Sequence, residues 1–140
     1  RGEILENVEG IPGGWILIVK PHLSISTKWA YESLTLSLTK DEGEAKLAAL
    51  LVNLQRFPNA ALATYNSFEA GAIERFPAIA EALATLGEAR PMLRSLSGSG
   101  SACFAVFREE REAKEALGRF SRERFFTRIA QPIDDAVRLW

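Results

Sequence analysis

The sequence predicts an α+β fold of the ferredoxin-like type, a split βαβ sandwich in which helices cover one face of an antiparallel sheet. Two observations support this prediction. Short apolar or alternating runs typical of strands lie at residues 15–20, 92–96, 103–107 and 124–130. Helical patterns separate the first run from the second and the third from the fourth, which gives the order β-α-β-β-α-β.

The first predicted elements are a buried strand and a short helix. Residues 15–20 form a continuous apolar run with β-branched members, of a length suited to a buried strand, and Pro21 ends it. Ser26 or Thr27 then offers a hydroxyl that caps the helix expected at residues 28–34. This helix therefore begins beside two hydroxyl-bearing residues.

The middle of the chain predicts further helices. Residues 44–56 carry leucines at the i, i+3, i+4 and i+7 positions of an amphipathic helix. These leucines are Leu47, Leu50, Leu51 and Leu54. Asn66 stands where a helix cap is expected, and Glu69 follows three positions later, as in a capping box. That helix runs to about Phe76, and Pro77 begins the next one at its first position.

The last third of the chain predicts a hairpin, a helix and a final strand. Residues 92–96 and 103–107 are the two strands around a serine-glycine loop at residues 97–101. Residues 109–119 have the pattern of a charged amphipathic helix. Residues 124–130 alternate well enough to form a last, edge-like strand.

The serine-glycine loop has two interpretations. Glycines at alternate positions permit positive φ angles and bring backbone N–H groups close to a ligand, while serine hydroxyls suit phosphate oxygens. The same glycines commonly mark a β-hairpin turn. Ser26 and Thr27 are equally open, because a helix N-terminus can hold an anionic or polar ligand or be capped by the hydroxyl alone. The residues alone do not decide between a ligand site and a hairpin turn at the loop, or between a ligand site and simple capping at Ser26 and Thr27.

Composition limits the possible classes of protein. The 140 residues suit one domain, and the net charge of −1 gives no electrostatic case for a nucleic-acid partner. The longest apolar stretches, near residues 15–19 and 47–52, fall far short of the roughly 20 residues that span a bilayer, and no signal peptide is predicted.

The lone Cys103 allows no internal disulfide and suits a reducing, cytoplasmic location. Because the chain opens on Arg1 without a methionine, we expect a piece of a longer protein.

The sequence offers no convincing catalytic or metal-binding set. His22 is the lone histidine, so neither a histidine metal cluster nor a Ser-His-Asp triad is predicted. Cys103 lies in an apolar run without a partner and is expected to pack as a small hydrophobic residue. By its own chemistry the chain is a domain that helps to hold a ligand, with no catalytic residue and no metal ligand.

Four motifs, in order, carry a family resemblance. Lys20-Pro21 followed by residues 25–31 (ISTKWAY) resembles a segment of the 4-diphosphocytidyl-2-C-methyl-D-erythritol kinases. Residues 66–69 (NSFE) are similar to a helix start of that family, and residues 76–79 (FPAI) to the segment of an aromatic residue, proline, any residue and Ile or Leu that follows it. Residues 96–104 (LSGSGSACF) resemble the third signature of the wider GHMP kinase superfamily. Ser67, where the family usually has Asp, and Ser101, where Pro is common, are mild departures.

The resemblance implies a fold, a reaction and a site. It implies that residues 1–140 are a GHMP kinase C-terminal domain of ferredoxin-like order, without the N-terminal domain that carries the ATP-binding loop, the catalytic lysine and the aspartate. The complete enzyme would transfer the γ-phosphoryl group of ATP, with Mg²⁺, to the 2-hydroxyl of 4-diphosphocytidyl-2-C-methyl-D-erythritol. Ser26 and Thr27 would face the methylerythritol end of that substrate. The residues that would border the ATP phosphates are Ser97, Gly98, Ser99, Gly100 and Ser101.

Other functions remain open at this point. The domain could belong to another GHMP small-molecule kinase, of the homoserine type, or be a free-standing ferredoxin-like module that senses a ligand at its loop. A structural dimerisation domain is a further possibility, with the strand near Phe125 and Phe126 as its candidate surface. We expect a monomer or a weak dimer that is inactive as a kinase without its missing half.

Overall fold

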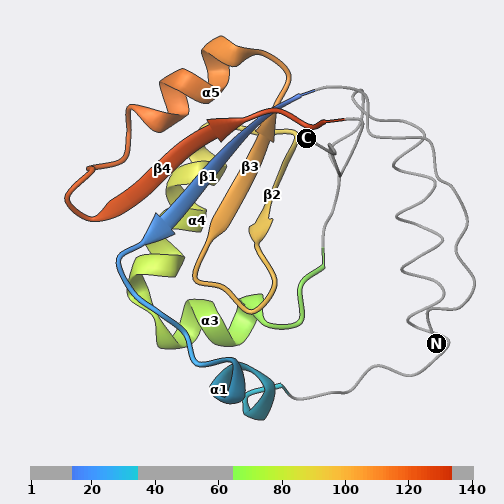
Figure 1. Cartoon of the computed structure of the whole chain (residues 1–140), viewed down its shortest axis with the longest axis vertical. Coiled ribbons are helices and arrows are strands. Elements are labelled where there is room, and N and C mark those ends of the chain that lie inside the picture. The colour runs from blue at the N-terminus through green and yellow to red at the C-terminus, as the bar shows by residue number, and fades with distance from the viewer. Residues whose placement is uncertain (1–13, 35–64, 134–140) are drawn as a thin grey trace, which may run out of the picture.

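A computed structural model describes residues 14–34 and 65–133 of the chain (Figure 1). Its elements, in chain order, are β1 (Trp15–Pro21), α1 (Thr27–Glu32), α3 (Glu69–Arg75), α4 (Pro77–Glu88), β2 (Leu93–Leu96), β3 (Cys103–Phe107), α5 (Glu110–Leu117) and β4 (Phe125–Ala130). All four predicted strands, and the predicted helices that fall within the described residues, are present within one or two residues of their predicted bounds. The helix predicted at residues 44–56 lies outside the described residues.

The strands form one sheet in the order β2-β3-β1-β4, and every neighbouring pair is antiparallel. In the centre, Leu17 of β1 pairs with Ala105 of β3 on one side and with Ile129 of β4 on the other. Because β3 lies between β1 and β2, the chain must cross over it, and the helices between β1 and β2 supply that crossover. The predicted split βαβ arrangement and the edge position of the last strand are confirmed.

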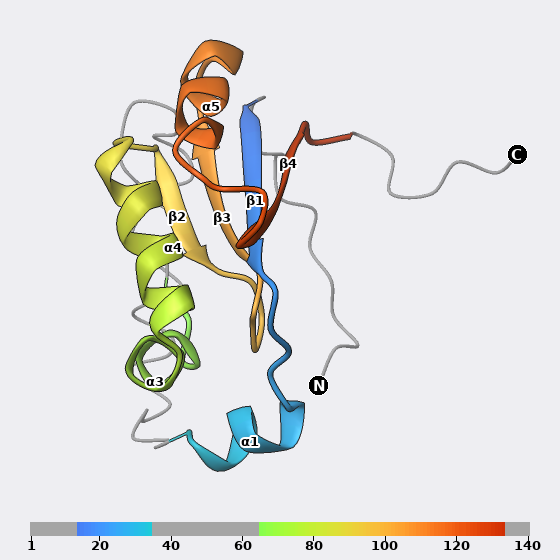
Figure 2. The same cartoon turned by 90° about the vertical axis from the view of Figure 1, so that its left-hand side faces the viewer.

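Alternation along the strands directs one set of side chains into the core. Leu17 and Val19 of β1 and the odd-numbered residues of β3 are fully or almost fully buried, and they pack against residues of α4 and α5. The contributing helix residues are Ile79, Ala82, Leu83, Leu86, Ala113 and Ala116. Figure 2 shows α4 lying along this face of the sheet. Burying one Leu or Phe side chain contributes about 1.5–3 kcal/mol, so this single core stabilises the domain.

The opposite face of the sheet carries the side chains that alternate with these buried ones along the strands. Ile16, Ile18, Phe104 and Val106 are half-buried there, and Phe126 of the edge strand is 55% exposed. Figure 1 views the molecule from this side, with α4 behind the strands. No helix within the described part of the chain is long and apolar enough to cross a membrane.

The helix boundaries follow local chemistry. Ser26 caps α1 as predicted, because its Oγ accepts a hydrogen bond from the N–H of Trp29 at 3.4 Å. Pro77 stands at the first turn of α4, where its missing N–H costs no hydrogen bond. Glu112 accepts from the N–H groups of Arg108 and Glu109 at the start of α5. The start of α3 differs from its prediction and belongs to the candidate site.

Candidate functional site

The serine-glycine loop connects β2 to β3 as a hairpin turn. The N–H of Ser97 donates to the carbonyl of Ala102 at 2.8 Å, and the N–H of Gly100 donates back to the carbonyl of Ser97 at 2.9 Å. Gly98 and Gly100 have φ angles of 54° and 88°, a region that L side chains rarely adopt. The hairpin interpretation is confirmed, and the glycines are required by the turn itself.

The outer side of the loop presents backbone donors. Ser97 and Gly98 are exposed, and Ser99 and Gly100 are half-exposed. The N–H groups of Gly98 and Ser99 have no acceptor among residues 14–34 and 65–133. Adjacent free N–H groups flanked by serine hydroxyls are suited to an anion such as a phosphate oxygen. That the loop contacts a cofactor stays a prediction.

The inner side of the loop is attached to the connection between β1 and α1. Ser101 is 3% exposed, and its hydroxyl donates to the carbonyl of Leu23 at 2.8 Å. Gly100 lies so close to Ile25 that an added Cβ would stand 2.9 Å from the Ile25 Cδ1 atom. The structure therefore brings the loop together with the residues just before Ser26. It also directs the Ser101 hydroxyl inward, which leaves Ser97 and Ser99 as the hydroxyls on the more exposed side.

Asn66 and Glu69 do not form the predicted capping box. The helix α3 begins at Glu69 with Phe68 as its N-cap and no capping side chain. The Asn66 Oδ1 atom accepts from the N–H of Phe68 at 2.9 Å, while its Nδ2 donates to the carbonyls of Leu96 and Gly98 at 2.8 and 2.9 Å. The Glu69 Oε2 atom accepts from the N–H of Leu96 at 2.8 Å and from the Ser95 hydroxyl at 3.0 Å. The capping-box prediction is wrong.

The physical reason for the difference is the position of β2 at the edge of the sheet. Residues on either side of Leu96 are bonded to β3, so the N–H and carbonyl of Leu96 point away from the sheet. Unpaired backbone groups are costly to leave without partners when they are partly buried, and the two polar side chains satisfy them. The Asn-x-x-Glu spacing was the available signal, but it suits a capping box equally well.

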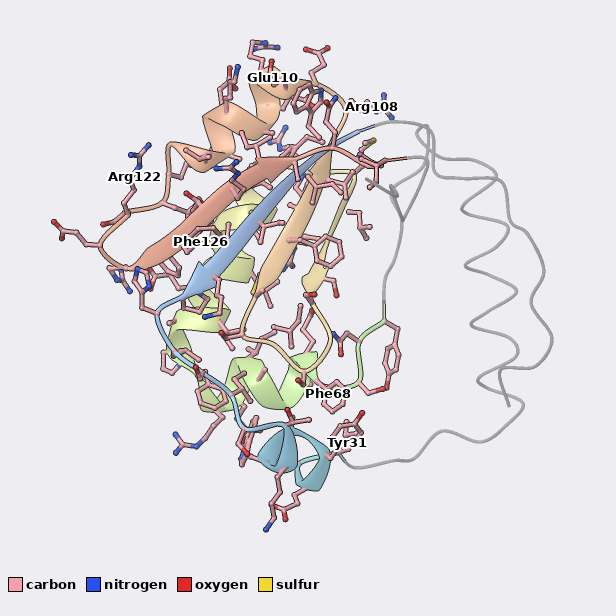
Figure 3. All side chains as sticks on the ribbon, viewed as in Figure 1. Tyr31, Phe68, Arg108, Glu110, Arg122 and Phe126 are labelled. Atoms are coloured by element: carbon pink, nitrogen blue, oxygen red, sulfur yellow. The ribbon has the colours of Figure 1, made fainter. Side chains whose placement is uncertain are left out.

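Aromatic contacts attach α1 to the neighbouring helices. The rings of Trp29 and Phe76 meet edge to face with centroids 5.0 Å apart, and those of Tyr31 and Phe68 do so at 5.2 Å. Such pairs contribute about 0.5–1.5 kcal/mol beyond their buried area. Figure 3 shows Tyr31 and Phe68 together at the end of the sheet where the hairpin loop lies. Ser26 and Thr27, both exposed, are therefore held at that same end.

The one cysteine of the chain supplies no reactive thiol. Burial raises the pKa of the Cys103 thiol from 9.0 to about 12, with a further contribution from the negative charge of Glu69. A thiol with this pKa is protonated and unreactive at neutral pH. His22 is exposed, with its Nε2 3.5 Å from the carbonyl of Arg122. Among the described residues, no three His, Cys, Asp or Glu side chains converge as metal ligands.

A four-stranded antiparallel sheet in split βαβ order, with helices packed on one face, is the fold of a GHMP kinase C-terminal domain. Residues 45–125 match the family described as "GHMP kinases C terminal", and the chain belongs to this family.

Two curated relatives share one name. The chain is 34% identical over 131 residues to a 4-diphosphocytidyl-2-C-methyl-D-erythritol kinase of Chlorobium phaeobacteroides (strain BS1), covering 94% of the chain and 46% of that protein. It is 33% identical over 130 residues to the protein of that name from Geotalea daltonii, covering 87% of the chain and 42% of the relative. The chain thus spans less than half the length of these curated relatives.

Two solved structures share the fold. A homoserine kinase from Cytophaga hutchinsonii ATCC 33406 superposes with a TM-score of 0.67 at 17% identity, covering 86% of the chain and 41% of that structure. A 4-(cytidine 5'-diphospho)-2C-methyl-D-erythritol kinase superposes with a TM-score of 0.63 at 23% identity, covering 90% and 46%. At these identities the superpositions establish the fold, and both agree with the predicted ferredoxin-like domain.

Proposed function

We propose that this chain is the substrate-side half of an ATP-dependent kinase that phosphorylates the 2-hydroxyl of 4-diphosphocytidyl-2-C-methyl-D-erythritol. The observation that carries the proposal is the hairpin loop, whose free N–H groups at Gly98 and Ser99 lie on a domain of the GHMP kinase family. The shared name of the relatives supports the choice of acceptor. The product would be an intermediate of isoprenoid precursor synthesis, made in the cytoplasm.

In this proposal the chain's own residues bind and orient the reactants. Phosphoryl transfer depends on positioning and on electrostatic stabilisation of the phosphate oxygens. The N–H groups of Gly98 and Ser99 and the hydroxyls of Ser97 and Ser99 would donate to the phosphates of ATP from one side of the site. Gly100 and Ser101 would hold the loop beside the start of α1, because both lie against the β1–α1 connection.

The acceptor would lie against the start of α1. Ser26 and Thr27 are exposed at the end of the sheet that carries the loop, and their hydroxyls can bond a polyol. The Ser26 Oγ atom already accepts from Trp29, and it can still donate to a substrate hydroxyl. The proposed site therefore lies between the hairpin loop and the start of α1.

The Mg²⁺ ion that accompanies ATP is assigned no ligand in this chain. The described residues bring no three carboxylate, imidazole or thiol groups together, so they do not fit a resident metal site. Because the relatives are more than twice as long as the stretch that this chain matches, the proposal places the catalytic groups in their additional part. The 140 residues alone should then show no kinase turnover.

The test compares the 140-residue chain with the complete protein encoded by its gene. Both are incubated with ATP, Mg²⁺ and either 4-diphosphocytidyl-2-C-methyl-D-erythritol or L-homoserine, and ADP formation is followed. We expect turnover by the complete protein with the cytidine-bearing acceptor, and none by the chain alone. Turnover by the chain alone would refute its assignment as half of an enzyme. Phosphorylation of homoserine instead would establish the homoserine-type alternative.

The sensor alternative has a separate readout. Calorimetric titration of the isolated chain with nucleotides and amino acids distinguishes a free-standing binding module from an enzyme half. Micromolar binding of an amino acid, with no effect of nucleotides, would favour the sensor and contradict the kinase proposal.

A further inference from the structure

We infer that Asn66 and Glu69 are positioning residues that set the conformation of the hairpin loop and thereby present the N–H of Ser99 to a phosphate. The inference rests on the proposed function for the identity of the ligand, and on contacts in the structure for everything else. Nothing in the family match or in the names of the relatives assigns these two residues a role.

The first step of the argument is the convergence of both side chains on one residue. Leu96 is the last residue of β2, and the loop begins immediately after it. Its N–H is bonded by the Glu69 carboxylate at 2.8 Å and its carbonyl by the Asn66 amide at 2.8 Å. Both polar groups of the residue that starts the loop are therefore fixed by α3 and the turn before it.

The second step is that the Asn66 amide spans the turn. Its Nδ2 atom donates to the carbonyl of Gly98 at 2.9 Å as well as to that of Leu96. The carbonyl of Gly98 and the N–H of Ser99 belong to one trans peptide, in which they point in opposite directions. Holding the Gly98 carbonyl toward Asn66 therefore turns the Ser99 N–H away from Asn66.

The third step is that this N–H is itself a free donor of the loop. It has no acceptor within the described residues, and glycine at position 98 leaves the peptide that follows it free to rotate. Without the Asn66 bond the Gly98–Ser99 peptide could turn, and its donor would no longer point in one fixed direction. Preorganised donors stabilise charge on phosphate more effectively than mobile ones.

Each variant changes one side chain at a time. Asn66→Asp keeps the oxygen that accepts from Phe68 but loses the donor to Leu96 and Gly98. Glu69→Gln keeps the shape of the side chain and loses its charge. Ser67→Asp is the matched control, because it adds the same charge at an exposed neighbouring position whose side chain makes no hydrogen bond or ion pair within the described residues.

The first measurement needs no knowledge of the ligand. Two-dimensional NMR of the 140-residue chain should show shifted Gly98 and Ser99 amide resonances in Asn66→Asp and faster hydrogen exchange of the Leu96 amide in Glu69→Gln. The Ser67→Asp control should leave all three amides as in the wild type. Unchanged Ser99 and Leu96 amides in the two variants would overturn the inference, whatever the protein's function. If Asn66→Asp does not fold, the Glu69→Gln result decides.

The second measurement uses the complete protein with ATP and Mg²⁺. We expect kcat/KM for ATP to fall about tenfold in Asn66→Asp, because one well-oriented hydrogen-bond donor to a charged group is lost. Circular dichroism should show that this variant is folded at the assay temperature. Ser67→Asp should stay within twofold of the wild type. A folded Asn66→Asp enzyme that matches this control would refute the positioning role. If the wild type shows no kinase activity, the proposed function fails while the NMR experiment still tests the loop.

Discussion

The close approach of Gly100 to its neighbours allows a prediction that separates two effects of adding one methyl group. Gly98 and Gly100 lie in the same loop, and both have positive φ angles. An added Cβ at Gly98 would meet nothing within 4 Å. At Gly100 the same atom would lie 2.9 Å from Ile25 Cδ1 and 3.2 Å from Leu96 Cδ1. Gly98→Ala therefore measures the backbone cost, and Gly100→Ala measures that cost plus the steric one.

The magnitudes follow from these contacts. Placing an L residue in the left-handed region costs about 1–2 kcal/mol, which is the whole effect expected for Gly98→Ala. Overpacking adds about 1–3 kcal/mol, and the movable end of the Ile25 side chain favours the lower part of that range. We therefore expect Gly100→Ala to lower the free energy of unfolding by about 2–4 kcal/mol, roughly 1–2 kcal/mol more than Gly98→Ala.

Urea unfolding of the 140-residue chain, followed by far-ultraviolet circular dichroism, supplies both values. A third variant, Ile25→Ala, removes the nearest clashing atom, so the extra cost of Gly100→Ala should shrink by at least half in that background. Equal destabilisation by the two glycine variants, or no response to Ile25→Ala, would refute the argument from close approach.

Further predictions concern the core, the thiol and an ion pair. Leu83→Ala should destabilise the chain by about 2–5 kcal/mol, because Leu83 is 1% exposed. Phe126→Ala should cost about 0.5 kcal/mol, because Phe126 is 55% exposed. Similar losses in urea unfolding would contradict the core assignment. The Cys103 thiol, with its pKa raised from 9.0 to about 12, should resist alkylation in the native chain at pH 8, and fast labelling would count against its burial. Because the unfolded thiol ionises first, stability should fall as pH rises from 9 toward 12, and Cys103→Ala should reduce that fall. Glu81→Gln breaks the exposed ion pair with Arg124 and should lower stability by less than about 1 kcal/mol in thermal melts. High salt should remove this difference, because it screens exposed charges. A larger loss that does not depend on salt would argue against a surface ion pair.

The fold could be predicted from the sequence because its signals are local. The apolar run at residues 15–20 and the alternation at 124–130 each identify a strand without reference to the rest of the chain. Ser26 and Pro77 mark helix starts through chemistry that acts within one turn. Once the order of elements was known, the split βαβ topology followed from general rules of strand connection.

The candidate site was predicted less completely because its contacts are long-range. The hydroxyl of Ser101 turns inward to a carbonyl 78 residues away, which no local pattern can indicate. Asn66 and Glu69 have the spacing of a capping box, yet their side chains bond to the unpaired backbone N–H and carbonyl of Leu96 at the edge of β2 instead. Identifying these bonds required knowing which strand lies at the edge and what packs beside it.

The bonds of Asn66 and Glu69 to Leu96 also affect how the sheet behaves toward other molecules. A free strand edge exposes N–H and carbonyl groups that can pair with a strand of another chain and so promote aggregation. At the end of β2 both backbone groups of Leu96 are occupied by side chains of the same molecule, and a neighbouring strand would have to displace two hydrogen bonds to pair there. This part of the sheet is closed to strand addition by side chains alone.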